Sequence, residues 1–388
     1  MNAVSENTAA VRVYFPCTGL GREARGFEAF TRDCADALRD ESSVALSVFG
    51  GGGAMREHER AVFNLPRRSS AAAVVSRLVG RDPYFVEQAT FFAGFLPTLI
   101  VGAPDVVYFA DLNLGNACWH WRRISGQKFK LLFYNGGATR MPFTRCDLVQ
   151  QVSPEHLSDA TARGEDPDRH VLLPHGLAID ASWRPADEQE RRVTREALGV
   201  PTDRPLLISV GMLGHSVKRC DAVIRAVALL PEPRPHLLLL GAETKETQGI
   251  RQLAARILGS GCTIRSVARD EVLRANRAAD AFVIASLREG FGMAHLEALA
   301  EGLPCVATET ATSAYLGGPW GIRGNVGDDR ELAQLIARGL GEPRGAERAR
   351  LQHDWIAARF GWTKLAPRYV ELFRACAAGR RPQVGAAA

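Results

Sequence analysis

The stretch Ile284–Thr308, IASLREGFGMAHLEALAEGLPCVAT, carries the clearest fold signal in the chain. The apolar run Asp280–Ala285 leads into it and predicts a buried strand. Gly302 and Pro304 mark the end of a following helix, because glycine suits the position just past a helix and proline cannot continue one. The apolar run Cys305–Thr308 predicts a second strand. A strand, a helix and another strand in this order predict a parallel sheet.

The turn between the first strand and the helix suits a phosphate ligand. Gly290 and Gly292 carry no Cβ, so the backbone can come close to a ligand there. The helix is expected to begin near Met293, and the unpaired N–H groups at its start favour an anion such as a diphosphate. Two carboxylates, Glu289 and Glu297, bracket the turn. Because carboxylates repel phosphates, these two are expected to accept hydrogen bonds from sugar hydroxyls.

The segment Glu289–Glu297, EGFGMAHLE, resembles the E-x7-E signature of family 4 glycosyltransferases. The resemblance implies that Glu289 contacts the donor sugar and that Glu297 holds the nucleotide ribose. The alternative is a pair of exposed glutamates at a helix start, stabilised by the helix dipole. The polar segment Thr310–Ser313 is expected to be a loop near the ribose or phosphate. The residues between the two glutamates that are implied to meet the donor sugar and diphosphate are Gly290, Phe291, Gly292 and Met293.

The resemblance extends over nearly the whole chain and implies an α/β fold of the GT-B type, in which two Rossmann-like domains flank a cleft. A length of 388 residues suits two domains. We expect an N-terminal acceptor-binding domain over 1–180, a linker over 181–204 and a C-terminal nucleotide-sugar-binding domain over 205–360. A crossover helix over 361–378 is expected to pack on the N-terminal domain, and residues 379–388 are expected to form a disordered tail.

The loop after the first strand of the second domain supplies a cation. That strand is an apolar run ending at Gly211, and the resemblance implies that Lys218 in the loop grips the donor diphosphate and neutralises the leaving group. Met212 stands where the family usually has an arginine, so Arg219, or else Arg22 or Arg25 of the N-terminal domain, is a candidate for the missing charge. The resemblance also places Arg265, at the end of a short strand, near the nucleotide base. For Lys218 the alternative is a solvated lysine at a helix start.

Polar residues follow two strands that are expected in the first domain. The strand over 105–109 precedes Asp111, and the strand over 130–134 precedes Asn135. Ligands of open α/β sheets sit at the carboxyl ends of strands, so both are candidates for acceptor binding and catalysis, although Asp111 could equally cap the next turn. Many family members have a histidine at Asn135; an asparagine can position a hydroxyl but cannot act as a base. Gly26 matches the closing glycine of the family's loop near the donor phosphates.

The composition of the chain limits which cellular compartment and which binding partners are expected. The net charge of +5 is small and dispersed, so nucleic-acid binding has no support. The eight cysteines lack a CxxC or zinc spacing, and the polar start MNAVSENTAA lacks the apolar core of a signal peptide, which together suggest a cytoplasmic protein. The apolar run Phe91–Ala103 is too short to span a bilayer. It is expected to be a buried helix plus turn, or else a hydrophobic surface that meets a lipid-linked acceptor at the membrane.

The resemblance to family 4 glycosyltransferases implies a retaining hexosyltransferase that moves a sugar from a UDP- or GDP-sugar to an acceptor hydroxyl. The acceptor is left open between a glycan, a lipid-linked molecule and a small molecule. No cofactor is expected, and metal independence is expected because enzymes of this fold usually work without an Asp-x-Asp metal site. One alternative is a non-catalytic nucleotide-sugar-binding protein, which the residues Met212 and Asn135 favour. Another is a different enzyme on the same fold, such as a nucleotide-sugar epimerase or a phosphorylase.

Overall fold

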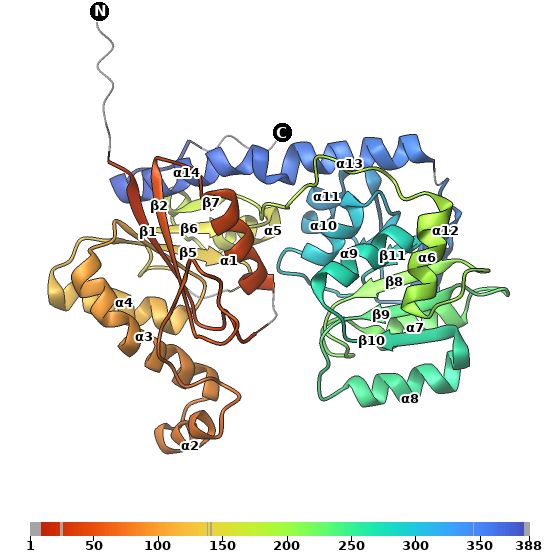
Figure 1. Cartoon of the computed structure of the whole chain (residues 1–388), viewed down its shortest axis with the longest axis horizontal. Coiled ribbons are helices and arrows are strands. Elements are labelled where there is room, and N and C mark those ends of the chain that lie inside the picture. Colours follow the sequence, from red (N-terminus) through yellow and green to blue (C-terminus); the bar gives the residue numbers. More distant parts are fainter. Residues whose placement is uncertain (1–8, 24–25, 138, 140–141, 344, 384–388) are drawn as a thin grey trace, which may run out of the picture. The chain divides into compact units, whose positions relative to one another are not determined.

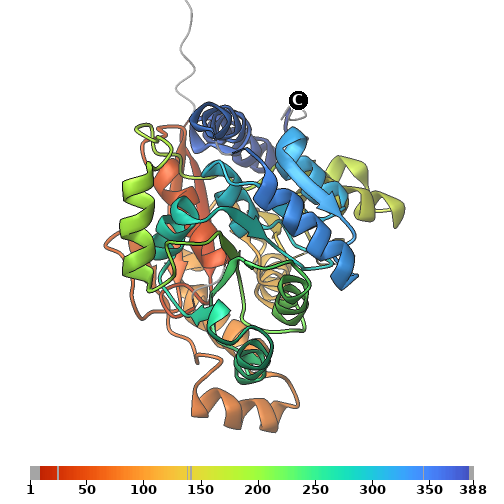
Figure 2. The same ribbon diagram turned by 90° about the vertical axis from the view of Figure 1, so that its right-hand side faces the viewer.

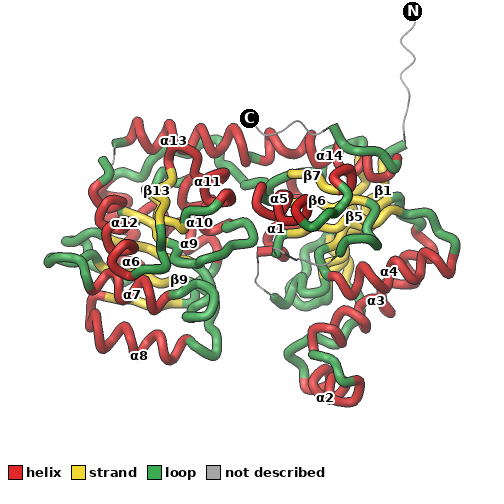
Figure 3. The backbone as a smooth tube through the Cα atoms, turned by 180° about the vertical axis from the view of Figure 1, so that it is seen from behind, coloured by secondary structure: helices red, strands yellow, loops and turns green. Residues whose placement is uncertain are grey.

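The computed structural model contains two compact units, and each is a parallel sheet between layers of helices (Figure 1, Figure 3). The first unit comprises the chain up to Ala178 and again from Phe360 onward, and the second comprises Ile179–Arg359. This architecture confirms the expected α/β class. The residues that the structure describes are 9–23, 26–137, 139, 142–343 and 345–383.

The sheet of the first unit has seven parallel strands in the order β3-β2-β1-β4-β5-β6-β7. The order reverses between β1 and β4, so these neighbours form the topological switch point at which ligands of such sheets bind. The strands are β1 (Val11–Cys17), β2 (Val44–Gly50), β3 (Glu59–Ala61), β4 (Val106–Phe109), β5 (Lys130–Asn135), β6 (Leu148–Gln151) and β7 (His170–Leu172). The helices are α1 (Gly26–Ala37), α2 (Ser70–Val79), α3 (Pro83–Gly102), α4 (Leu112–Ser125), α5 (Pro154–Ala162) and α14 (Trp362–Ala378).

Aromatic side chains fill both faces of this sheet. On one face, rings of α3 such as Phe91 and Phe95 are completely buried against the sheet. On the other, Phe30 of α1 stacks on Tyr134 at 4.6 Å between ring centroids and also meets Tyr369 of α14 at 6.0 Å. The hydroxyl of Tyr369 donates to the carbonyl of Pro174 at 2.8 Å. Helix α14, although last in the sequence, is therefore part of the core of the first unit.

The apolar run Phe91–Ala103 is part of a longer helix than its sequence suggested. Helix α3 has 20 residues and begins where the side chain of Asp82 accepts a hydrogen bond from the N–H of Phe85. Pro97 lies inside α3 and does not end it. By length and composition alone α3 could cross a membrane, and 33% of its most apolar window is buried in the protein. Such a helix is also what the core of a globular domain contains.

The sheet of the second unit has six parallel strands in the order β10-β9-β8-β11-β12-β13, with the switch point between β8 and β11. Helices α7, α8 and α12 pack together on one face and bury the main apolar cluster (Figure 2). The strands are β8 (Leu206–Val210), β9 (His236–Leu240), β10 (Cys262–Arg265), β11 (Ala281–Val283), β12 (Cys305–Thr308) and β13 (Gly321–Gly324). The helices are α6 (Glu188–Leu198), α7 (Cys220–Ala228), α8 (Thr247–Leu258), α9 (Arg269–Ala278), α10 (Met293–Ala300), α11 (Ala311–Gly317), α12 (Asp329–Gly341) and α13 (Ala346–Phe360).

The strand–helix–strand unit predicted from Ile284–Thr308 is confirmed. Strands β11 and β12 pair in parallel, with Phe282 opposite Cys305, and α10 crosses between them. Gly302 has a positive φ of 75° just past the helix, which an L-residue with a Cβ adopts only with strain.

One expected loop is wrong. Residues from Ala311 onward form α11, because the side chain of Thr310 accepts from the N–H of Ser313 and the Ser313 hydroxyl accepts from the N–H of Thr310. This reciprocal cap starts a helix, whereas a run of small polar residues also suits a loop.

The end of the chain is ordered for several residues beyond α14. Gly379 ends α14 with a φ of 66°, and Arg380 then returns to pair with Glu371 at 2.7 Å. Arg381 pairs with Asp168 at 2.8 Å. Residues 379–383 of the segment expected to be a disordered tail thus have defined contacts, and 384–388 lie outside the described residues.

Candidate functional site

The switch point of the second unit carries an ion pair. Lys218 follows β8 and Glu289 follows β11, and the fold brings these two predicted donor-site residues together, with 2.6 Å between Nζ and Oε1. Their side chains are only 18% and 22% exposed. Partial burial reduces screening by water, so this pair interacts more strongly than a pair on the open surface.

Gly211 makes room for the lysine. A Cβ at this position would lie 2.7 to 2.9 Å from three methylene carbons of Lys218. The absence of a side chain lets the lysine fold back across the end of β8 and reach Glu289. The predicted role of Gly211 in the donor site therefore has a packing reason in this chain.

The start of α10 offers unpaired donors. Gly292 is the N-cap with a φ of 96°, and no side chain caps the helix there. The first N–H groups of α10, beginning with Met293, are thus left for water or an anion. Phe291 is 3% exposed, so its ring supports the turn from the interior. The hydroxyl of Ser286 is buried and has no hydrogen-bond partner within the part of the chain that the structure describes, which suits a ligand-binding position.

The second glutamate of the motif is held by an arginine. Glu297 is 6% exposed, and its Oε1 accepts from Nε of Arg269 at 2.9 Å. This buried carboxylate is therefore fixed by Arg269, a residue that the sequence analysis missed. Arg265 donates to the carbonyl of Leu198 at 3.0 Å and pairs with Glu271 at 3.4 Å. Its guanidinium is engaged away from Lys218.

Arg219 is also engaged by the protein. It has a positive φ of 50°, and its guanidinium donates to the carbonyl of Val326 at 2.6 Å and to that of Ala285 at 3.3 Å. These partners are neutral, so the charge of Arg219 stays near the switch point even though its donors are largely used. Met212, in the position where the family usually has an arginine, is 46% exposed.

A histidine of α10 is held neutral. His295 is 3% exposed, and its Nε2 has no partner among the described residues. Burial, assisted by the positive charge of Arg323, lowers the pKa of His295 to about 4. At neutral pH this ring therefore carries no charge.

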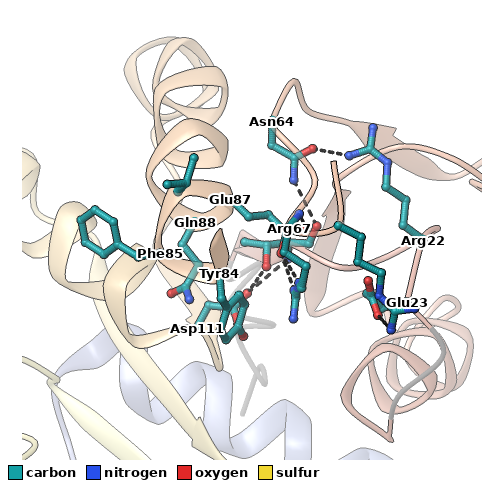
Figure 4. A network of polar contacts seen from close by, with 12 residues as sticks. Arg22, Glu23, Asn64, Arg67, Tyr84, Phe85, Glu87, Gln88 and Asp111 are labelled. Carbon is teal, nitrogen blue, oxygen red and sulfur yellow. Dashed lines mark hydrogen bonds and ion pairs between the residues drawn. The ribbon is translucent and has the colours of Figure 1, made fainter. Parts of the chain in front are cut away.

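The switch point of the first unit carries a carboxylate with three donors (Figure 4). Asp111 follows β4, and its Oδ2 accepts from the hydroxyl of Thr18 at 2.7 Å and from the N–H of Thr18 at 3.3 Å. The hydroxyl of Tyr84 donates to Oδ1 of the same carboxylate. Thr18 follows β1, so the contact spans the two strands of the switch point. Asp111 does not cap α4 with its side chain, which removes the simpler structural role considered for it.

The other two predicted residues of the first unit have contrasting surroundings. Asn135 is 2% exposed, and its amide bonds to both backbone groups of Thr139 and to Gln151. Its hydrogen-bonding groups are thus occupied by the protein. Gly26 is the first residue of α1, and a Cβ there would meet nothing within 4 Å.

Within the described ranges no group of three or more histidine, cysteine or acidic side chains could hold a metal ion. Seven of the eight cysteines are buried, and Cys262 is partly exposed.

Part of the amino-acid sequence is similar to known glycosyltransferases. Residues 190–353 match the profile of the family described as glycosyl transferases group 1. A D-inositol 3-phosphate glycosyltransferase of Xylanimonas cellulosilytica is 31% identical over 232 residues, which cover 56% of this chain and 54% of the relative. A D-inositol 3-phosphate glycosyltransferase 2 of Catenulispora acidiphila is 32% identical over 245 residues, covering 58% and 55%. The chain thus spans about half the length of the curated relatives it matches.

Solved structures extend the likeness to both units. A sucrose-phosphate synthase from Thermosynechococcus elongatus has a TM-score of 0.77 at 20% identity, covering 95% of this chain and 99% of that one. HepE of Anabaena, in complex with UDP and glucose, has a TM-score of 0.74 at 17% identity, covering 94% and 100%. Residues 190–353 are thus similar to the glycosyl transferases group 1 family, and the two units have the GT-B fold.

Proposed function

We propose that this protein is a retaining glycosyltransferase, which moves a sugar from a nucleoside diphosphate sugar to an acceptor hydroxyl. The observation that carries the proposal is the Lys218–Glu289 pair at the β8/β11 switch point, 2.6 Å apart and beside the uncapped start of α10. A cation and free backbone N–H groups suit a diphosphate, and a carboxylate suits sugar hydroxyls.

In the proposed donor site, Lys218 and the turn of Gly290 and Gly292 bind the diphosphate. Glu289 orients the donor sugar, and Glu297, fixed by Arg269, receives the ribose hydroxyls. A UDP-sugar is the first donor to test, because HepE of Anabaena was solved with UDP-glucose. GDP-sugars are the second.

The proposed reaction needs no protein nucleophile. The acceptor oxygen forms a bond to the anomeric carbon while the bond from that carbon to the diphosphate breaks, and the departing phosphate oxygen takes the acceptor proton. Attack on the same face as departure keeps the anomeric configuration. Catalysis then consists of placing the acceptor and stabilising the leaving group. Lys218 supplies the positive charge, so the reaction is proposed to be metal-independent.

The acceptor is proposed to bind the first unit near Asp111. Arg22, which follows β1, donates to the neutral side chain of Asn64 at 2.6 Å and has no carboxylate partner among the described residues. Its uncompensated charge favours an anionic acceptor. Because the relatives are named for D-inositol 3-phosphate, this phosphorylated polyol is the first acceptor to test.

The proposed compartment is the cytoplasm, where thiols stay reduced, because most of the cysteines are buried rather than paired at the surface. A peripheral membrane contact would suit a lipid-linked acceptor. On helix α2, Val74 is 56% exposed and Leu78 is 81% exposed. These two apolar side chains would be the ones to test for such a contact.

A second candidate is a non-catalytic nucleotide-sugar-binding protein. Met212 in place of the usual arginine favours it, since the diphosphate then loses one cation. So does the occupied amide of Asn135. A binder would retain donor affinity and show no turnover with any acceptor.

The test combines binding with turnover. Thermal unfolding is followed with UDP, GDP, ADP, dTDP and their sugar conjugates, because a ligand of the folded state raises its apparent stability. Nucleotide release is then measured with D-inositol 3-phosphate and with other polyols. We expect one nucleotide to raise Tm and acceptor-dependent release of that nucleotide. Lys218→Met is the matched variant and should lose the shift. No shift with any nucleotide would contradict the proposal, and a shift without turnover would favour the binder.

A further inference from the structure

Tyr84, in the first turn of α3, completes the hydrogen bonding of Asp111. With the hydroxyl of Tyr84 on Oδ1 and two donors of Thr18 on Oδ2, the carboxylate accepts three hydrogen bonds. A carboxylate offers about four lone-pair sites, so one of them remains for a further donor. A hydroxyl group of a ligand is such a donor.

The ring of Tyr84 is itself held in place. The guanidinium of Arg67 lies 3.9 Å from its centroid, and Arg67 donates from Nε to Oε2 of Glu87 at 2.6 Å and from its backbone N–H to Oε1 at 3.1 Å. Glu87 is 1% exposed and the side chain of Arg67 is 15% exposed, so the carboxylate of this ion pair is buried and two hydrogen bonds hold Arg67 in place. Figure 4 shows Arg67, Tyr84 and Asp111 gathered at one place, where Arg67 lies over the Tyr84 ring and the Tyr84 hydroxyl bonds Asp111.

The polar network around Asp111 contains more buried polar side chains than are needed to pack α3 against the sheet. Replacing buried ion pairs and carboxylates by apolar side chains is often neutral or stabilising for a fold, so their presence at a strand end points to a ligand. The polar side chains of this network that are at most 4% exposed are Thr18, Asn64, Glu87, Gln88 and Asp111. They gather at the carboxyl ends of β1 and β4, where ligands of such sheets bind.

We propose that Tyr84 is a positioning residue for the acceptor, an inference that rests on the proposed function. Tyr84 fixes Oδ1 of Asp111, and the remaining lone pair of the carboxylate accepts a hydrogen bond from a hydroxyl group of a polyol acceptor other than the attacking one. That hydrogen bond fixes the orientation of the acceptor. The proton of the attacking hydroxyl passes to the departing phosphate oxygen, so neither Asp111 nor Tyr84 changes its charge over the reaction.

The test removes one hydroxyl group. Tyr84→Phe keeps the ring beneath Arg67 and deletes the hydroxyl that donates to Asp111. We expect kcat/KM for the acceptor to fall about 10- to 100-fold, the range for losing a hydrogen bond to a charged group, while the donor Kd stays unchanged. Tyr108→Phe is the matched control: it deletes a tyrosine hydroxyl that is bonded to Gln150 and lies on β4, outside the network of Asp111. It should lower Tm without changing the acceptor kinetics.

A double variant separates positioning from a structural role. If Tyr84 acts through Asp111, then Tyr84→Phe combined with Asp111→Asn should be no slower than Asp111→Asn alone. Additive losses, or acceptor kinetics that Tyr84→Phe leaves unchanged, would overturn the role of Tyr84 while the proposed function stands. If the unaltered protein turns over no acceptor, the proposed function fails and the role of Tyr84 fails with it.

Discussion

The Lys218–Glu289 pair predicts that one substitution will change the binding of a nucleotide and of its sugar conjugate differently. In the ligand-free protein, Nζ of Lys218 lies 2.6 Å from Oε1 of Glu289. A diphosphate must therefore compete with this carboxylate for the lysine. Glu289→Gln keeps the size of the side chain and removes its charge, which weakens the competitor.

The size of the effect follows from the kind of hydrogen bond. Glu289→Gln replaces an ion pair by a bond from the lysine cation to a neutral amide, and this loss of charge attraction is expected to free the lysine by about 1–1.5 kcal/mol. UDP should then bind about 5- to 10-fold more tightly to Glu289→Gln. For UDP-glucose this gain is offset, because the neutral amide that replaces the carboxylate makes a weaker bond to a sugar hydroxyl. The preference for UDP-glucose over UDP should fall about tenfold.

The assay is isothermal titration of both ligands into both proteins at one ionic strength. Lys218→Met serves as the control and should weaken UDP and UDP-glucose by the same factor, since it removes a contact to the diphosphate that both ligands share. If Glu289→Gln also changes the two dissociation constants by one common factor, Glu289 acts only on the lysine. The role of orienting the donor sugar would then be refuted. If GDP rather than UDP raises Tm, the same comparison is made with GDP ligands.

Three further predictions concern packing and pH. Gly211→Ala places a Cβ within 2.9 Å of the Lys218 methylene carbons and so displaces the lysine. The dissociation constant of the donor should rise about tenfold in the same titration. An unchanged dissociation constant would show that the lysine can bind the donor from another position. Phe30→Ala empties a site whose ring is 1% exposed, and the free energy of unfolding in urea should fall by about 3–5 kcal/mol. Because burial lowers the pKa of His295 from 6.5 to about 4, the unfolded chain binds this proton more tightly between those pH values. Stability should therefore fall as pH drops through that window, by about 2 kcal/mol at pH 5 from this group, and the urea midpoint of His295→Gln should fall less from pH 7 to pH 5.

Residues that begin and end helices made the order of strands and helices in the second unit predictable from the sequence. Gly302 and Pro304 end α10, and the turn with Gly292 begins it, so the strand–helix–strand order could be predicted directly. Short polar elements were harder to predict. Thr310 begins a helix through a cap with Ser313 that looks like a loop in the sequence. Strand β3, Glu59–Ala61, carries no apolar alternation, and only its pairing with β2 at the sheet edge makes it a strand.

The partners of the candidate residues depended on tertiary structure. Lys218 and Glu289 are 71 positions apart, and a role could be predicted for each of them without the contact between them. Tyr84 was not singled out at all, because a tyrosine at the start of an apolar helix has an ordinary core role. Its bond to Asp111, 27 positions on, exists only because α3 ends the excursion from β2 back to β4. Arg269 was missed for the same reason.

The strand order of the first unit has a consequence for how such an enzyme could change its substrate. The residues Arg67, Tyr84 and Glu87, which build the network beside Asp111, are encoded in one uninterrupted segment, residues 59–102. A recombination event with ends in the exposed turns on either side would replace this whole wall at once. The pair of Lys218 and Glu289, encoded more than a hundred residues later, would be inherited intact. Under the proposed function, exchange of this one segment between relatives would be a short route to new acceptors with an unaltered donor site.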